Sequence, residues 1–258
     1  MTKDKIQYFR PNSLEEALAL KKQYGKEAQF LSGGVFKPQL KDETAVLIDL
    51  QDAKLDSAEA TEESTKYGAL VPLQMVDECL DLPDFSEALS TEFGVNVRNS
   101  LSLGNFLGQA NGRSTTLCCL NALGTKVISM NHPAPWPLVD FLRANTIDDL
   151  VIEVQIPTAK GLAFETVGRS PKDLPIVCVA AVKNPDGTIN VAFGGAYDIF
   201  DSIALSRLMD DGQEAIKTAF ANSDDKWASA EYRQSAASIL LARALQKLER
   251  AGRDQEEK

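Results

Sequence analysis

The chain has 258 residues, of which 44% are hydrophobic, so it can bury the core of one large domain or of two smaller ones. Its 27 basic and 37 acidic residues give a formal charge of -10, which argues against a surface built for nucleic acids or anionic membranes. No run of about 18 apolar residues indicates a membrane-spanning helix and no apolar N-terminal segment indicates a secretory signal, so we expect the cytoplasm.

The N-terminal part of the chain alternates helix and strand. Residues 13–24 predict a helix, because Ser13 and Glu16 form a capping box and the apolar residues that follow share one face. The apolar runs 28–31 and 45–50 predict two short buried strands. This order of elements is typical of an α/β arrangement.

A long segment with few charges lies in the middle of the chain. A strand and a short helix around Pro72 come before it, followed by an amphipathic helix over 82–93. Residues 94–116 are rich in Gly, Asn and Ser and too long for an ordinary connection, so we expect a loop with a function of its own. After it the sequence predicts a helix over 116–123, a strand over 125–130, a helix over 137–145 and a strand over 151–157.

The pattern changes after residue 159. Residues 162–198 read as three antiparallel strands with a turn at 184–187. Helical patterns follow over 202–210, 214–222 and 230–251. We therefore expect an α+β protein in which an α/β domain over 1–159 precedes a smaller domain over 160–258, built from a three-stranded antiparallel sheet and helices.

The cysteines and the single histidine do not form a pattern that binds metal. The four cysteines are Cys79, Cys118, Cys119 and Cys178, and no CxxC occurs. Iron–sulfur and structural zinc sites need several thiolates or imidazoles at short spacings, so we expect no metal in this chain. Cys118 and Cys119 lie in an apolar stretch typical of buried, unreactive thiols. No nucleophile–base pair or carboxylate dyad emerges either, so no catalytic residue is predicted, as expected where a bound cofactor carries the chemistry.

One glycine-rich turn could bind a phosphate. Ser32, Gly33 and Gly34 follow an apolar strand, and glycines let a backbone approach and bend around an anion. Alone, the same residues could simply end the strand. Val35 and Phe36 come next, where a phosphate loop usually offers polar groups.

Five segments, in this order and spacing, carry a resemblance to a known family. They are YFRPNSLEEALAL, FLSGG, VRNSLSLGNFLGQA, GRSPKDLPIVCVAA and SAEYRQSAASILLARAL, the last with a Ser-x-x-Tyr-Arg motif. Together they resemble the FAD-binding medium subunit of the molybdenum hydroxylases, the family of xanthine dehydrogenase and aerobic carbon monoxide dehydrogenase. The likeness runs over almost the whole chain.

The resemblance implies both a fold and a role. The fold would be an FAD-binding PCMH-type domain, similar to vanillyl-alcohol oxidase, followed by a domain like the C-terminal domain of carbon monoxide dehydrogenase flavoproteins. Two loops would hold the FAD pyrophosphate through their backbone. The partners would be a small subunit with two [2Fe–2S] clusters and a large molybdopterin subunit, and this oxidoreductase subunit would pass their electrons through FAD to an acceptor.

The resemblance also implies which residues contact the cofactor. From the first loop these are Phe30, Leu31, Ser32, Gly33, Gly34, Val35 and Phe36; from the second loop Ser102, Leu103, Gly104 and Asn105; and elsewhere Ser114, Thr115, Val151 and Glu165. Val35, Phe36, Asn105, Thr115 and Glu165 depart from the family pattern, so we expect backbone amides, including those of Gly104 and Asn105, to carry the pyrophosphate.

Some residues and the function itself allow a second reading. Arg98 and Asn99 could form a loop-bracing ion pair or cap, or they could contact the ligand, and we expect the brace or cap. Arg169 and Asp173 could form an interdomain or subunit brace, or they could contact the ligand, and again we expect the brace. His132 stands in a proline-rich turn and is expected to be structural. Because the flavin motifs are altered, the alternative function is a relative that has lost FAD and serves as a scaffold or assembly subunit.

Overall fold

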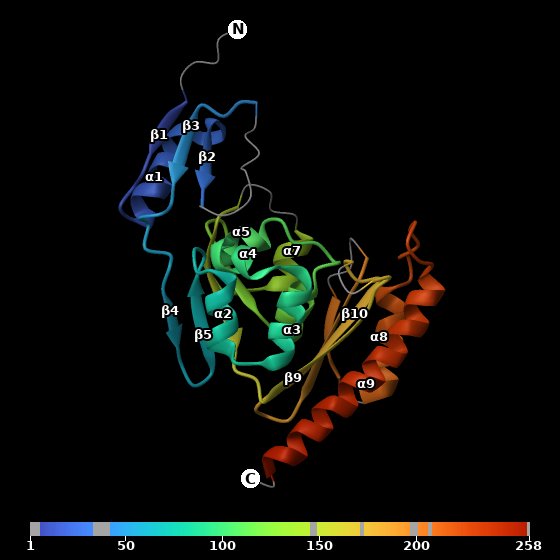
Figure 1. Cartoon of the computed structure of the whole chain (residues 1–258). Helices are drawn as coiled ribbons and strands as arrows, with labels where there is room; N and C mark the ends of the chain where they lie inside the picture. The colour runs from blue at the N-terminus through green and yellow to red at the C-terminus, as the bar shows by residue number, and fades with distance from the viewer. Residues whose placement is uncertain are drawn as a thin grey trace.

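The computed structural model of the chain describes residues 6–32, 42–144, 149–170, 173–196, 201–205 and 208–256 (Figure 1). These ranges form a three-stranded, a five-stranded and a four-stranded sheet, each with helices packed on it. The three-stranded unit projects at the N-terminal end, the five-stranded sheet lies in the middle, and the four-stranded sheet lies on the C-terminal side (Figure 1). No helix in the described part of the chain is both long and apolar enough to cross a membrane.

The N-terminal unit is a small parallel sheet covered by one helix. Strands β1 (Gln7–Phe9), β3 (Val46–Asp49) and β2 (Ala28–Leu31) pair in parallel in the order β1-β3-β2. Helix α1 (Leu14–Tyr24) and the short 3-10 helix η1 (Gly25–Glu27) join β1 to β2. Ser13 caps the helix as predicted, since its Oγ accepts the N–H of Glu16 at 3.2 Å. Glu16 Oε2 reaches back one residue further than in a standard capping box and accepts the N–H of Asn12 at 3.0 Å.

The middle sheet has five strands and is covered by short helices. Its order is β4-β5-β8-β6-β7, with antiparallel pairing throughout. The strands are β4 (Ala58–Ala60), β5 (Ser64–Gly68), β6 (Lys126–Ser129), β7 (Trp136–Pro137) and β8 (Val151–Pro157). The helices are α2 (Leu73–Leu80), α3 (Pro83–Glu92), α4 (Val95–Ser100), α5 (Leu103–Leu107), α6 (Thr115–Ala122) and α7 (Leu138–Arg143).

The expected long loop over 94–116 is largely helical. It contains α4 and α5, each too short to leave a helical period in the sequence. Both are held by contacts distant in the sequence: the N–H of Leu73 donates to Leu101 O at 3.0 Å, and the N–H of Leu103 donates to Val71 O at 2.8 Å. Tertiary contacts thus override a composition that resembles a loop.

The C-terminal sheet confirms the three predicted strands and adds a fourth. Strands β9 (Gly161–Val167), β10 (Val177–Lys183), β11 (Ile189–Gly194) and β12 (Asp201–Leu205) pair antiparallel in the order β12-β11-β10-β9. The prediction of a helix over 202–210 was wrong at its start, because β12 pairs along the free edge of β11 and helix α8 (Leu208–Ala219) begins after it. Helix α9 (Ala230–Glu256) covers one face of the sheet (Figure 1).

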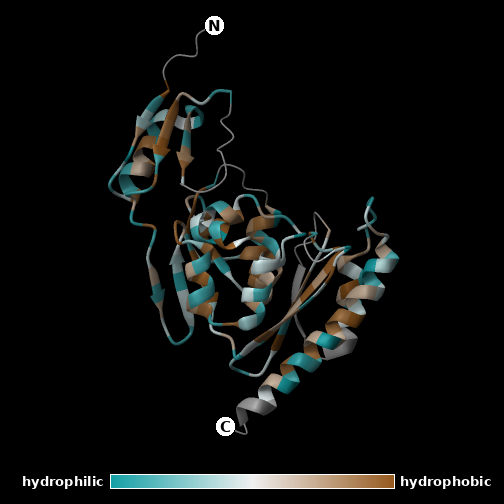
Figure 2. Ribbon diagram, in the orientation of Figure 1, coloured by the Kyte–Doolittle hydropathy of each residue, from teal (hydrophilic) through white to brown (hydrophobic). Residues whose placement is uncertain are grey.

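One apolar core continues from the middle sheet into the C-terminal sheet. All eight residues of α6 are buried, and this helix packs against α3 on one side and against β10 and β11 on the other. The same cluster contains Tyr67 and Val154 of the middle sheet and Phe164, Cys178 and Ala192 of the C-terminal sheet. Figure 2 shows the hydrophobic residues running along these strands. The two sheets are therefore not separable without exposing apolar surface.

A buried arginine fixes the start of α9. Arg233 is fully buried, and its guanidinium donates to Ile176 O at 3.2 Å, to Ser223 O and to Asp225 Oδ1 at 2.8 Å. Ser229 caps the helix by accepting the N–H of Tyr232 at 3.2 Å. The Ser-x-x-Tyr-Arg motif therefore anchors α9 to the chain before it and to the segment that leads into β10.

Replacing Arg233 with alanine is expected to destabilise the fold strongly. Ile176 O and Ser223 O would lose their donor, and Asp225 would lose its cation. We expect the free energy of unfolding in urea to fall by about 3–5 kcal/mol. Arg250→Ala, on the exposed side of the same helix, is the matched control and should change it by less than about 0.5 kcal/mol. Equal effects of the two substitutions would contradict the role of Arg233.

Candidate functional site

The second predicted loop is seated on the middle sheet through a glycine. A Cβ added at Gly104 would lie 2.9 Å from Ala69 Cβ and 3.0 Å from Ala69 O, closer than real contacts allow. Ala69 in turn donates its N–H to Ile152 O of β8 at 3.0 Å. Glycine is therefore required here because α5 begins directly against the ends of β5 and β8.

The first backbone amides of α5 are already bonded within the protein. The N–H of Leu103 donates to Val71 O and that of Gly104 to Ala69 O, both at 2.8 Å. The N–H of Asn105 points to Ser102 Oγ at 3.4 Å, since Ser102 caps the helix. This differs from the expectation that the amides of Gly104 and Asn105 remain for a pyrophosphate, so other atoms of this loop must supply any contact.

The first predicted loop is described only at its start. Gly33, Gly34, Val35 and Phe36 lie outside the described residues, whereas Phe30 and Leu31 end strand β2 and Ser32 follows it, all three partly buried. Leu31 O accepts the N–H of Leu50 at 2.8 Å. The loop thus leaves the carboxyl end of a parallel strand, where ligands bind in open parallel sheets.

Residues beside the two predicted loops pack against one apolar core. Phe30, Leu70, Leu150 and Ile152 all pack against the apolar core of the N-terminal unit. Leu70 follows Ala69, on which Gly104 sits, and Leu150 precedes Val151 at the start of β8. The end of β2 and the segments that precede α5 and begin β8 therefore converge on the core of the N-terminal unit.

The position of this region is suitable for binding FAD. An elongated dinucleotide can lie between two bodies that each present a turn to it, and Gly104 keeps one of these turns close to the sheet. Val151 itself is buried in the main core, so only its backbone could face a ligand. The described donors of the second loop fit less well, because its leading amides are committed.

Ser114 and Thr115 direct their hydroxyls inward. Ser114 Oγ donates to Glu92 Oε2 at 2.8 Å and accepts the N–H of Leu117 at 3.0 Å. Thr115 Oγ1 donates to Ala88 O at 2.7 Å. Both residues are buried, so the structure gives their side chains a capping and packing role at the start of α6.

Glu92 is a partly buried carboxylate that sequence reasoning missed. Its Oε2 accepts from Ser114 Oγ and, at 3.1 Å, from the N–H of Thr116 in the first turn of α6. Burial of the carboxyl raises its pKa, and these hydrogen bonds only partly offset the shift. No local sequence spacing predicts the contact, because Glu92 is the last residue of α3 and its hydrogen bonds are to the start of α6.

Glu165 lies on the C-terminal sheet, near Lys247 of α9. It is on β9, partly buried, and pairs with Val179 of β10. Partial burial lowers the pKa of Lys247 on α9, but the hydrogen bond to Asp84 and the charges of Asp84, Glu87 and Glu165 outweigh this and raise it. The contacts thus place Glu165 between the sheet and α9, with no described contact to residues 102–105.

Arg98 and Asn99 make contacts of the loop-bracing kind predicted for them, and His132 packs as a structural residue. Arg98 lies 3.8 Å from Asp77, and the side-chain amide of Asn99 donates to Val95 O at 2.9 Å. His132 stacks on Trp136 with ring centroids 4.0 Å apart and lies 3.7 Å from Asp149. Arg169 pairs with Asp173 at 3.1 Å within one segment, so their predicted role as an interdomain or subunit brace stays a prediction.

The predicted buried thiols are also confirmed. Cys118, Cys119 and Cys178 are free and buried, and burial raises the pKa of Cys119. Among the described residues, no group of three His, Cys, Asp or Glu side chains is placed to hold a metal ion.

Substitution of Gly104 tests the seat of α5. Gly104→Ala should lower the free energy of unfolding by about 1–3 kcal/mol, because the new methyl group meets Ala69. Adding Ala69→Gly should recover part of the loss, since it removes one of the two clashing groups. Gly108→Ala, where a Cβ makes only ordinary contacts of 3.6 Å, is the control and should change stability by less than about 0.5 kcal/mol. A lack of recovery in the double variant would contradict the contact.

Replacing Glu92 with glutamine should alter the pH dependence of stability. Because the folded pKa of Glu92 is raised above 4.5, the folded state holds this proton more tightly, and the contribution is lost as pH rises. A glutamine side chain cannot ionise, so the advantage of Glu92→Gln over wild type should grow between about pH 4 and pH 7 in urea unfolding. A difference that does not change with pH would show that Glu92 is not desolvated.

Comparison with known proteins identifies the family. Residues 4–159 match the model described as the FAD binding domain in molybdopterin dehydrogenase. YgfM of Escherichia coli (strain K12), an uncharacterised protein, is 25% identical over 256 residues, which cover 96% of this chain and 98% of YgfM. The caffeine dehydrogenase subunit beta of Pseudomonas sp. (strain CBB1) is 26% identical over 195 residues, 68% of this chain and 66% of that one.

Solved structures share the fold over nearly the whole length. A chain of reconstituted CO dehydrogenase from Oligotropha carboxidovorans has a TM-score of 0.72 at 20% identity, covering 95% of this chain and 98% of that one. A chain of quinoline 2-oxidoreductase from Pseudomonas putida 86 has a TM-score of 0.70 at 18% identity, covering 96% and 98%. The predicted fold class is therefore confirmed, and the chain belongs to the family of FAD-binding domains of molybdopterin dehydrogenases.

Proposed function

We propose that this chain is the FAD-binding electron-transfer subunit of a molybdenum hydroxylase complex. It would receive electrons from the [2Fe–2S] clusters of a small partner subunit, which a large molybdopterin subunit feeds, and deliver them to an acceptor. The observation that carries the proposal is the match of residues 4–159 to the family's FAD-binding domain, together with relatives aligned over 96% of the chain. FAD is the group that exchanges the electrons when bound.

The chain's own residues would bind and orient the cofactor. The turn over Ser32–Gly34 and the start of α5 at Ser102–Asn105 would flank the pyrophosphate from two sides. The N–H groups of Leu103 and Gly104 are committed to carbonyl groups, and the side-chain oxygen of Asn105 accepts from Gln109, so we expect the second loop to supply fewer polar contacts than the first. The first loop would supply backbone amides.

We propose the remaining features on the same basis. The division would fall between residues 159 and 160, although the two parts share one core around α6. The iron–sulfur and molybdopterin subunits would be the partners, and the cytoplasm the compartment. The caffeine dehydrogenase subunit beta, by its name, is itself one subunit of a dehydrogenase, which supports a complex.

Direct binding of FAD tests the proposal. Purified protein with FAD at about 100 times its dissociation constant should gain about 2.7 kcal/mol of stability, which corresponds to roughly 5–10 °C in the unfolding midpoint. Gel filtration should then leave one flavin per chain, and dithionite should bleach its absorbance.

Riboflavin at the same concentration is the matched control. It lacks the pyrophosphate and the adenosine, so it should give little or no shift if two loops hold the pyrophosphate. No shift and no retained flavin with FAD would refute the proposed function and favour the alternative of a scaffold subunit that has lost the cofactor.

A further inference from the structure

Two arginines from different parts of the chain hold three consecutive carbonyl groups. Arg113 lies between α5 and α6 and donates to Leu174 O at 2.9 Å and to Pro175 O at 3.3 Å. Arg233 of α9 donates to the next carbonyl, that of Ile176, at 3.2 Å. The segment that enters β10 is therefore fixed from the side of the FAD-binding domain and from the side of the C-terminal helix.

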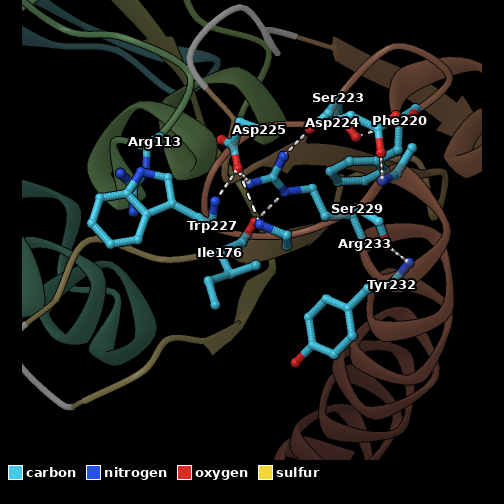
Figure 3. A network of polar contacts seen from close by, with 12 residues as sticks. Arg113, Ile176, Phe220, Ser223, Asp224, Asp225, Trp227, Ser229, Tyr232 and Arg233 are labelled. Carbon is cyan, nitrogen blue, oxygen red and sulfur yellow. Dashed lines mark hydrogen bonds and ion pairs between the residues drawn. The ribbon is translucent and has the colours of Figure 1, made fainter.

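Trp227 connects Arg113 to Arg233, because its ring lies beside Arg113 and its backbone N–H binds the same carboxylate as Arg233 (Figure 3). Its ring lies 5.2 Å from the guanidinium carbon of Arg113 and 4.0 Å from that of Arg169. Its backbone N–H donates to Asp225 Oδ1 at 2.8 Å, the same oxygen that Arg233 binds. Such stacking contributes about 0.5–1 kcal/mol at exposed sites and more where water is excluded.

A second contact fastens the same loop. The N–H of Gly195, at the end of β11, donates to Gly112 O at 2.7 Å. Gly195 has a φ of +121°, and a Cβ there would lie 2.2 Å from Ile176 O, so only glycine allows this approach. Residues 112 and 113 are thus held to the C-terminal sheet by two independent contacts.

This loop leads directly into Ser114 and Thr115, which the family resemblance predicts beside the cofactor. Because their side chains are bonded within the protein, this segment would meet FAD through its backbone. Arg113 precedes Ser114 and Thr115, whose side chains are fixed from the inside by Glu92 and Ala88. Arg113 fixes the same segment from the outside. The neighbouring arginines form ion pairs of their own: Arg169 pairs with Asp173, and Arg233 pairs with Asp225.

We propose that Arg113 is a positioning residue for the FAD site: by holding the 111–115 segment against the C-terminal domain, it sets the affinity for FAD without touching the cofactor. The inference rests on the proposed function. A segment that is already ordered loses less conformational entropy when a ligand binds, so removing the Arg113 contacts should weaken binding. By reciprocity, FAD should stabilise the junction at Trp227.

The experiment measures the dissociation constant of FAD for the full chain by quenching of flavin fluorescence. Arg113→Ala should weaken binding at least about fivefold, the lower end of ordinary coupling between two sites. Arg113→Lys, which keeps the charge but not the forked donors, should recover part of the affinity. Arg250→Ala removes an exposed arginine of α9 and should stay within about twofold of wild type.

Thermal unfolding without FAD distinguishes a role of Arg113 in stability alone from a role in FAD affinity. If Arg113→Ala lowers the unfolding midpoint but binds FAD within about twofold of wild type at a temperature where both are folded, the inference is overturned. If Arg113→Ala does not fold, Arg113→Met, which keeps most of the stem over Trp227, decides by the same criterion. Absence of FAD binding to the wild type overturns the proposed function and the inference with it, whereas equal binding by both proteins overturns the inference alone.

Discussion

The burial of α6 is the constraint on which both the fold and the candidate site depend. Every residue of this helix is buried, between α3 and the strands β10 and β11. The N–H groups of its first turn cannot reach water, and an unpaired buried donor costs about 1–3 kcal/mol. Glu92 accepts the N–H of Thr116 and Ser114 Oγ accepts that of Leu117, which commits the side chains of Ser114 and Glu92 to the protein. Residues that resemble a flavin motif in the sequence are in this way used for capping.

The sequence predicted the longer elements because their signals are local. Helix α1 begins after the Ser13 cap and β2 covers the predicted run 28–31, since side-chain spacing and the cap suffice to specify them. It did not predict β1, β12, α4 or α5. Each of these has six residues or fewer and owes its conformation to pairing or packing with distant residues, such as the pairing of β12 with β11.

The site was predictable in its outline but not in its atoms. The glycine at position 104 could be singled out from the sequence, yet its purpose, contact with Ala69, follows only from the fold. Likewise, no sequence pattern shows that the amides of Leu103 and Gly104 are already bonded. Glu92 binds Ser114, which is 22 residues further along the chain, and Arg113 binds a backbone carbonyl group that any residue could provide. Neither contact produces a residue pattern that a single sequence reveals.

These contacts bear on how such a chain can hold FAD with altered loops. Polar side chains at a phosphate typically contribute about 1.5–3 kcal/mol each, and the sequence lacks several of those that its family offers. Affinity also depends on how much order a ligand must impose, at about 0.5–1.5 kcal/mol for each flexible side chain that is immobilised. A segment fixed by Glu92 within the core and by Arg113 at the domain junction requires little further ordering. Preorganisation can thus offset part of what the missing contacts would have provided, and under the proposed role of Arg113 the affinity for FAD would depend on the contact between the 111–115 segment and the C-terminal sheet.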